Sequence, residues 1–201
     1  MRLALLLAAV CLVPIPSSAQ STQSFVQGFG GLRIASAPTI TPTAGATVGV
    51  GITPYIQAIG EFGHMSDVLP STYQTLLSVS PVGFHRSALY GEGGIRLTTP
   101  AIGHVGAYGE TLFGMARLTS SVSGIGSART DALTNLALRF ASTTGRVGAL
   151  GTGVILQGGP VFATIGYRFT RIFSDNAIDS LLMAGGHADV NEARVSFGFR
   201  F

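Results

Sequence analysis

Apolar and polar residues alternate with a period of two through eight segments of this chain, and this pattern predicts β-strands. The segments cover residues 24–34, 44–53, 55–65, 87–98, 104–116, 146–156, 161–173 and 188–201. Most of them have 10 to 13 residues. A strand of that length can cross a bilayer when it is tilted by about 45°.

Most charged residues of these segments share one face of the alternation. The face holds all four glutamates and most of the strand arginines: Arg33, Glu61, Glu92, Arg96, Glu110, Arg168, Glu192, Arg194 and Arg200. The opposite face holds large apolar residues, among them Phe62, Phe113 and Phe197. A soluble sandwich would have the reverse arrangement, whereas a β-barrel surrounded by lipid has charges inside and apolar residues outside.

Energetics decide which face points inward. A register shift of one residue would move the whole charged set to the lipid side. An arginine at the bilayer midplane costs roughly 2–4 kcal/mol, so the total would exceed the roughly 5–15 kcal/mol by which a domain is stable. The charges are therefore expected in the lumen. Arg171 is the exception: it is expected on the outer face, near the outer end of its strand, where its long side chain can reach lipid phosphates.

Short and long connections alternate along the chain. Short Gly- or Pro-rich turns are expected at 53–54, 99–103 and 157–160, and long loops at 35–43, 66–86, 117–145 and 174–187. Strict alternation with an even strand number is typical of outer-membrane barrels, whose turns are short on one side of the membrane. The prediction is an all-β protein: an eight-stranded antiparallel up-and-down transmembrane β-barrel.

One stretch of the chain leaves an alternative open. Residues 131–141 fit either a short helix or a strand, since Leu136 and Phe140 can share a face in both. A ten-stranded barrel would also need a strand at 75–84, and Pro81 opposes a central strand there.

The N-terminus has the features of a secretory leader. Arg2 precedes an apolar run, and small residues at 17–19 give a cleavage site before Gln20. We expect a signal peptide at 1–19 and one barrel domain at 20–201. Removal of the leader would remove Cys11, the single cysteine, so no disulfide is expected. The net charge of +3 is too small to indicate a nucleic-acid partner.

Chain order places the two signs of charge on opposite walls of the predicted barrel. Glu61, Glu92 and Glu110 lie on the third to fifth segments, whereas Arg168 and Arg194 lie on the last two. Side chains can fill the bore of an eight-stranded barrel, so we expect carboxylate–guanidinium pairs across the lumen. A second pair is expected between Arg33 and Glu192. Such a network predicts a filled structural barrel; the alternative is a narrow porin-like channel.

The sequence offers little support for catalysis. A lipid A deacylase would need a His-x-Ser-Asn run, but HADVN at 187–191 has Asp189 in place of the serine nucleophile. We therefore expect no enzyme, although an enzyme that modifies lipid A or phospholipid is a further, weaker alternative. No cofactor is expected, and no histidine or carboxylate spacing indicates a metal site.

The C-terminal segment ARVSFGFRF, with outward Phe197, Phe199 and Phe201, resembles the β-signal read by the barrel assembly machinery. Together with GYRFTRIF before it, the segment is similar to the small OmpA/OmpX-like outer-membrane β-barrel proteins of Gram-negative bacteria. The resemblance implies an outer-membrane location, with membrane lipid, lipopolysaccharide and the assembly machinery as partners. It leaves the oligomeric state open. Because such proteins range from structural anchors to adhesins, it implies a structural or surface-interaction role, with loops 66–86 and 117–145 as contact surfaces.

Overall fold

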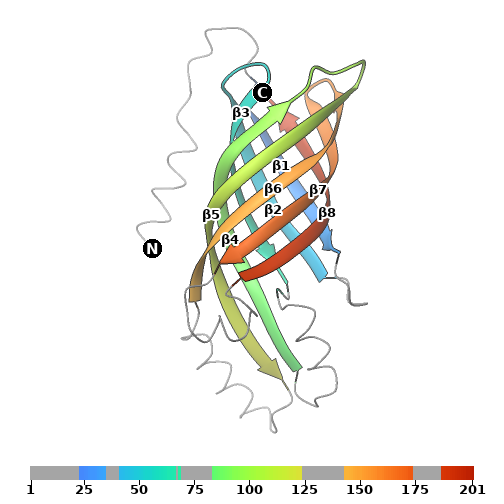
Figure 1. Ribbon diagram of the computed structural model, residues 1–201. Coiled ribbons are helices and arrows are strands. Elements are labelled where there is room, and N and C mark those ends of the chain that lie inside the picture. The colour runs from blue at the N-terminus through green and yellow to red at the C-terminus, as the bar shows by residue number, and fades with distance from the viewer. Residues whose placement is uncertain (1–22, 35–40, 67, 69–82, 124–142, 174–186) are drawn as a thin grey trace.

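The computed structural model describes residues 23–34, 41–66, 68, 83–123, 143–173 and 187–201. They form the strands β1 (Phe25–Arg33), β2 (Thr41–Gly51), β3 (Ile56–Met65), β4 (Gly83–Thr98), β5 (Val105–Ser123), β6 (Thr143–Gly158), β7 (Val161–Phe173) and β8 (His187–Arg200). Each strand pairs antiparallel with the next, and β8 pairs with β1, which closes the barrel (Figure 1). The predicted eight-stranded barrel is confirmed. None of the described residues forms a helix long and apolar enough to span a membrane.

The two ends of the barrel differ. At one end, here named the turn end, short connections join β2 to β3, β4 to β5 and β6 to β7. Gly103 and Gly159 both have a φ of 65° in these turns, a conformation that favours glycine. The backbones of Ser24 and Phe201 also hydrogen-bond to each other at this end. The other end, named the loop end, is where the four longer connections leave the barrel.

The sequence placed the ends of all four predicted loops inside strands: within 35–43, β2 already begins at Thr41, and within 174–187, β8 begins at His187. Within 66–86, β4 already begins at Gly83, and within 117–145, β5 continues to Ser123 and β6 begins at Thr143. Pairing of β4 with β5 extends to Gly83 and Ser123, beyond the level at which β3 and β6 end, so a two-stranded ribbon projects from the rim (Figure 1). The membrane alternation was absent there because the ribbon has left the apolar belt. The leader at 1–19 and the segment 131–141 lie outside the described residues.

The strands are tilted relative to the barrel axis, and the pairing register gives the displacement along the strands that accompanies this tilt. Starting at Arg200, the register runs once around the barrel and returns to β8 at Val190, ten residues nearer the loop end. A line drawn through the paired residues is therefore displaced step by step toward the loop end from β1 to β8. This stagger is what closing a barrel with tilted strands requires.

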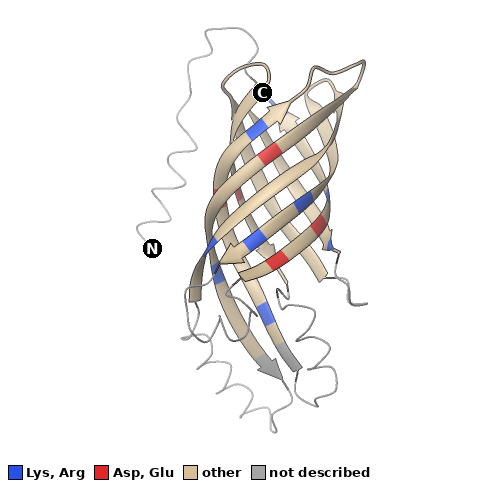
Figure 2. Ribbon diagram, viewed as in Figure 1, with Lys and Arg blue, Asp and Glu red and all other residues tan. Residues whose placement is uncertain are grey.

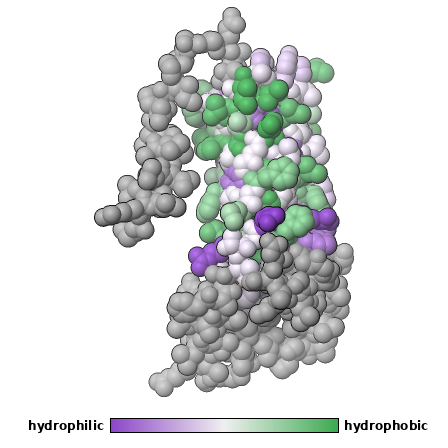
Figure 3. Space-filling view, turned by 60° about the vertical axis from the view of Figure 1, so that its left-hand side comes forward, coloured by the Kyte–Doolittle hydropathy of each residue, from purple (hydrophilic) through white to green (hydrophobic). Residues whose placement is uncertain are grey.

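The outer surface is apolar around the barrel, as the alternation predicts. Exposed side chains there include Phe113 (71%), Phe197 (68%) and Phe62 (59%). Figure 3 shows a belt of hydrophobic side chains on one side of the barrel, with hydrophilic side chains at its loop end. Charged residues are sparse along the strands (Figure 2), and most of those described point inward. A surface of this kind suits hydrocarbon and not water.

Candidate functional site

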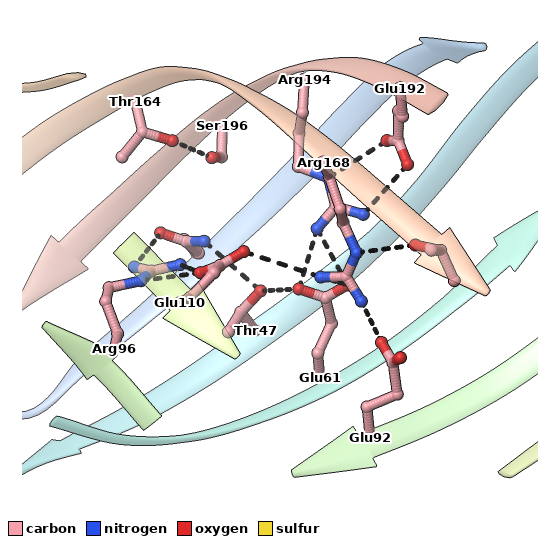
Figure 4. Close-up of polar contacts among 12 residues, drawn as sticks. Thr47, Glu61, Glu92, Arg96, Glu110, Thr164, Arg168, Glu192, Arg194 and Ser196 are labelled. Atoms are coloured by element: carbon pink, nitrogen blue, oxygen red, sulfur yellow. Dashed lines mark hydrogen bonds and ion pairs between the residues drawn. The ribbon is translucent and has the colours of Figure 1, made fainter. Parts of the chain in front are cut away.

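The charged side chains meet in the middle of the lumen, and they come from opposite walls. Strands β3, β4 and β5 supply Glu61, Glu92 and Glu110, and β7 and β8 supply Arg168 and Arg194 (Figure 4). Each of these residues is at most 7% exposed. Because strands opposite in the barrel are far apart in the chain, only closure brings the two signs of charge together.

Arg168 is the hub of this cluster. Its Nη1 lies 2.9 Å from Oε1 of Glu61 and 3.7 Å from Oε1 of Glu110, and its Nη2 donates to Oε2 of Glu92. Its Nε donates to Oγ1 of Thr170 at 3.2 Å. One guanidinium thus faces three carboxylates, with ion pairs from Nη1 and hydrogen bonds from Nη2 and Nε. A planar fork can spread its contacts over several acceptors in this way, and an ammonium cannot.

Arg194 connects Glu61 to one further carboxylate, that of Glu192. Its Nη1 donates to both oxygens of Glu61, at 2.8 and 2.9 Å. Its Nε and Nη2 donate to Glu192 at 3.1 and 3.2 Å. The guanidinium carbon also lies 3.7 Å from the ring centre of Phe29, a favourable contact of a cation with an aromatic face.

Glu61 and Glu92 are unequally satisfied. Besides the two arginines, Glu61 accepts hydrogen bonds from Thr47 and from the hydroxyl of Tyr90, both at 3.0 Å. Within the described part of the chain, Oε1 of Glu92 is buried and has no hydrogen-bond partner. Glu61 is therefore the better-held carboxylate of the two.

Another ion pair, between Arg96 and Glu110, lies nearer the turn end than Arg168 and Arg194. Arg96 donates to Oε2 of Glu110 from Nε at 3.0 Å and from Nη2 at 2.8 Å. Its guanidinium carbon lies 5.0 Å from the ring centre of Phe25 and 4.9 Å from that of Tyr108. This pair joins neighbouring strands, since Arg96 and Glu110 are direct register partners.

The remaining predicted members of the network are placed differently. Arg33 and Glu192 face each other in the register of β1 and β8, and Glu192 also accepts from Thr43 at 2.5 Å. Arg200 does not join the glutamates: its Nη1 donates to Gln157 at 2.9 Å, and it lies over the ring of Phe162. The physical reason is its position. Arg200 lies at the turn end of the barrel axis, farther toward that end than the carboxylates.

Buried apolar side chains pack around the charges along the barrel axis. One cluster extends from the turn end to the level of the charges, where Leu112 lies two residues nearer the loop end than Glu110: Phe25, Ile59, Tyr108, Leu112, Ala149, Ile155 and Phe162. Arg96 and Arg200 lie over aromatic rings of this cluster. The other cluster lies mainly toward the loop end: Phe29, Met65, Val68, Ala88, Tyr90, Ala116, Leu118, Val147, Ile172, Ala188 and Val190. Apolar side chains packed around an ion cluster keep water away and strengthen its electrostatic interactions.

Inward glycines leave room for the large side chains. A Cβ at Gly63 would lie 2.5 Å from the hydroxyl oxygen of Tyr90, its register partner on β4. A Cβ at Gly151 would lie 2.7 Å from Oε1 of Glu110. The bore is thus filled by large residues from one strand opposite glycines of the next.

Sequence reasoning missed several partners of the charged residues. Thr43 and Thr47 on β2 both donate hydrogen bonds to the buried glutamates, and Gln27 accepts from Arg96 at 3.3 Å. Parity could have identified Thr47, which points inward in the predicted strand 44–53, but Thr41 and Thr43 fell within the predicted loop 35–43. Threonine carries no charge, so its presence in a glycine-rich segment did not indicate contact with the charged residues.

The residues considered for catalysis lie on the outside of the barrel. Asp189 is held by Arg171, whose Nε and Nη2 donate to its two oxygens at 2.6 and 2.7 Å. His187, the first residue of the HADVN run, has the same outward parity as Asp189 on β8. Among the described residues, no three His, Cys, Asp or Glu side chains are grouped as a metal site would require.

A closed eight-stranded barrel with an apolar outside and a filled, charged interior has the architecture of the small outer-membrane proteins. Solved structures share the barrel fold. Neisserial surface protein A matches at a TM-score of 0.54 and 15% identity, over 88% of this chain and 95% of that one. Ail, the attachment invasion locus protein of Yersinia pestis, matches at 0.51 and 13%, over 90% and 100%. A major outer membrane protein from Thermus thermophilus matches at 0.52 and 9%, over 90% and 100%.

Sequence comparison adds nothing to this likeness, because no protein-family model and no curated protein matches the chain. At identities of 9 to 15%, the solved structures establish the fold.

Proposed function

We propose that this protein is an integral outer-membrane barrel whose filled lumen serves stability, and whose loop end presents a surface for interaction. The observation that carries the proposal is the filling of the lumen: the ion cluster is at most 7% exposed, its members from opposite walls pair with one another, and buried apolar side chains pack around them. Ions cross a pore along a polar, hydrated path. Charged side chains that are buried and already paired therefore favour a closed barrel over the narrow porin-like channel.

The projecting ribbon supports the surface role. β4 and β5 stay paired to Gly83 and Ser123, beyond the neighbouring strands. The two loops predicted to contact a partner, 66–86 and 117–145, are both attached to this ribbon. The ribbon would therefore hold them away from the membrane. Outer-membrane lipid, lipopolysaccharide and the barrel assembly machinery are the partners this role implies.

Conductance tests the closed lumen. The mature chain is reconstituted in planar bilayers, with insertion verified by protease protection of the same sample and a known porin as positive control. We expect no discrete current steps. Steps whose size changes in Arg168→Gln or Glu92→Gln would overturn the closed-lumen proposal and favour the channel.

Trimming tests the surface role. Residues 124–142 are replaced by a short Gly-Ser turn, which leaves every paired residue of β5 and β6 in place. The shortened barrel should still fold, as shown by its faster migration in an unheated SDS gel, and should lose adhesion to host-cell or extracellular-matrix surfaces. If the intact barrel binds none of these surfaces, or the trimmed one binds them equally, the proposed surface role is wrong.

A further inference from the structure

Arg200 differs from the arginines of the ion cluster, because no carboxylate among the described residues contacts it. Its Nη1 donates to Oε1 of Gln157 at 2.9 Å, and its guanidinium carbon lies 4.8 Å from the ring centre of Phe162. A hydrogen bond and an aromatic face together hold the guanidinium in one orientation. The side chain is half-buried at the turn end, so this fixed cation is still within reach of solvent.

Other arginines of this barrel bind carboxylates through the edge of the guanidinium that carries Nε and Nη2. Arg171 uses the two atoms on the two oxygens of Asp189, at 2.6 and 2.7 Å. Arg96 uses both on Oε2 of Glu110, at 3.0 and 2.8 Å. In Arg200 this edge has no hydrogen-bond partner within the described part of the chain, since Nη1 makes the bond to the glutamine. Its two parallel N–H groups match the two oxygens of a carboxylate.

The acidic side chains of the protein are placed too far toward the loop end to fill this edge. Glu110 is the described carboxylate nearest the turn end, and it is already held by Arg96 and lies 3.7 Å from Arg168. The acidic residues outside the described part are at positions 67, 131, 175 and 179, in connections that leave from the loop end. The cation at the turn end therefore has no acidic side chain to neutralise it.

Two further polar side chains line the bore at the turn end, on β3 and β4. Gln57 is the register partner of Arg96, and Thr98 is the register partner of Tyr108. Register partners share a face of the sheet, so both side chains point into the bore. Both are half-buried, and neither makes a side-chain hydrogen bond to another residue in the described part of the chain. Amide and hydroxyl groups can donate and accept hydrogen bonds, which suits the peptide groups of a ligand.

We propose that the turn end of the bore binds the terminal carboxylate of a short peptide from the aqueous phase on that side of the membrane. The two carboxylate oxygens accept from Nε and Nη2 of Arg200, and the last peptide groups meet Gln57, Thr98 and Gln157. Because the bore behind the site is filled, the end of a chain can dock there without passing through the barrel. The site goes beyond the proposed function, since it lies at the opposite end from the interaction surface.

NMR titration of the refolded mature barrel in detergent micelles tests the site. The readouts are the Nε–H signal of Arg200 and the side-chain amide signals of Gln57. The probes are N-acetyl-alanyl-alanine, the same dipeptide with an amidated C-terminus, acetate and inorganic phosphate, at matched ionic strength. We expect a saturable shift with the free acid, with an apparent Kd at least about threefold lower than that of acetate or phosphate. The amidated dipeptide should give no saturable shift.

Two variants at the turn end and one control separate this site from general attraction of anions. Arg200→Gln removes the guanidinium and should weaken binding of the free acid by about tenfold or more. Gln157→Glu keeps the size of the side chain but places a carboxylate beside Arg200, which should occupy the cation and weaken binding to a similar extent. Arg171→Gln removes the same charge from the outer face near the loop end and should leave binding unchanged.

Several outcomes would overturn the site. Equal binding of the amidated dipeptide would show that the carboxylate is not recognised, and equal binding of acetate or phosphate would contradict a peptide ligand. The absence of a saturable shift with the free acid, or unchanged binding in Gln157→Glu, would contradict the role of Arg200. Folding of each variant is checked by its faster migration in an unheated gel. If Arg200→Gln does not fold, Gln157→Glu and the Arg200 signal of the unmodified barrel decide.

Discussion

Glu61 and Glu92 lie directly opposite each other on β3 and β4, and the guanidinium of Arg168 from the far wall contacts both. Like charges in direct register repel, so this arrangement depends on the arginine between them. The two sides of the barrel are therefore linked through its centre by an interaction that forms only when the sheet closes.

Removal of that link should be costly. Arg168→Met leaves two buried carboxylates without their shared cation, and the loss of one partner of a buried ion pair costs roughly 3–5 kcal/mol. The measurement is urea unfolding in lipid vesicles, followed by circular dichroism because the chain has no tryptophan. Arg171→Met, on the same strand but facing outward, is the matched control and should change the free energy of unfolding by less than about 1 kcal/mol. Equal effects of the two variants would refute the central role of Arg168.

The two facing glutamates should respond differently to neutralisation. Glu61→Gln disrupts bonds to Arg168, Arg194, Thr47 and Tyr90, and we expect a loss of about 3 kcal/mol in the free energy of unfolding. Glu92→Gln removes a like charge opposite Glu61, and its amide oxygen can still accept from Arg168 while the amide nitrogen takes the place of Oε1, which has no hydrogen-bond partner, so a loss of about 1 kcal/mol or less is expected. The same urea titration compares them. A larger loss for Glu92→Gln would contradict the unequal roles assigned to the pair.

Features of the fold that are determined by residues close together in the sequence can be predicted from it, and features that depend on pairing between distant segments cannot. Strand number and face parity follow from local alternation and from the cost of charge in lipid, and both are confirmed by the burial of Glu61, Arg168 and Arg194 and the exposure of Phe113. The ends of β4 and β5 were wrong, because polar residues such as those at 119–123 pair beyond the membrane, where no alternation is required.

To predict which side chains contact one another inside the lumen, it is not enough to know which face of its strand each residue occupies. Parity says that Arg200 points inward, but its depth along the axis depends on the ten-residue stagger, which no local pattern contains. That depth places Arg200 beside Gln157 at the turn end. Thr43 and Thr47 likewise become partners of glutamates only once β2 is set in register with β1 and β3.

Glycine at position 63 should be required by the side chain of Tyr90. Gly63→Ala would force its Cβ against the phenol ring, and overpacking of this kind costs about 1–3 kcal/mol. Gly91→Ala, on the outer face with nothing within 4 Å of the added carbon, should change stability by less than about 0.5 kcal/mol. In a double-mutant cycle, Tyr90→Leu should relieve at least about 1 kcal/mol of the Gly63→Ala cost. Strict additivity would show that the two positions do not compete for space.

The apolar belt should reject charge at its centre and accept it at its edge. Phe113→Arg places a guanidinium on the exposed outer face of β5, and we expect a loss of roughly 2–4 kcal/mol in vesicles. Thr144→Arg introduces the same residue at the level of Arg117, its neighbour in the register, and should cost about 0–1 kcal/mol. Phe113→Leu controls for the lost ring. If Phe113→Arg were as harmless as Thr144→Arg, the belt would not be in contact with hydrocarbon.

The terminal phenylalanine offers a test of assembly that is separate from stability. Phe201 exposes 73% of its surface, and its backbone bonds to Ser24 do not depend on the side chain. Phe201→Ser should therefore fold normally from urea into detergent, with an unchanged free energy of unfolding. In cells, the same variant should show a severalfold lower fraction of folded barrel in unheated gels of the membrane fraction, because the outward aromatic is the feature that resembles a β-signal. Val161→Ser, exposed on the adjacent strand near the same end, removes a similar apolar contact and should assemble normally. Equal assembly of Phe201→Ser and the unmodified chain would leave the resemblance without a role in this protein.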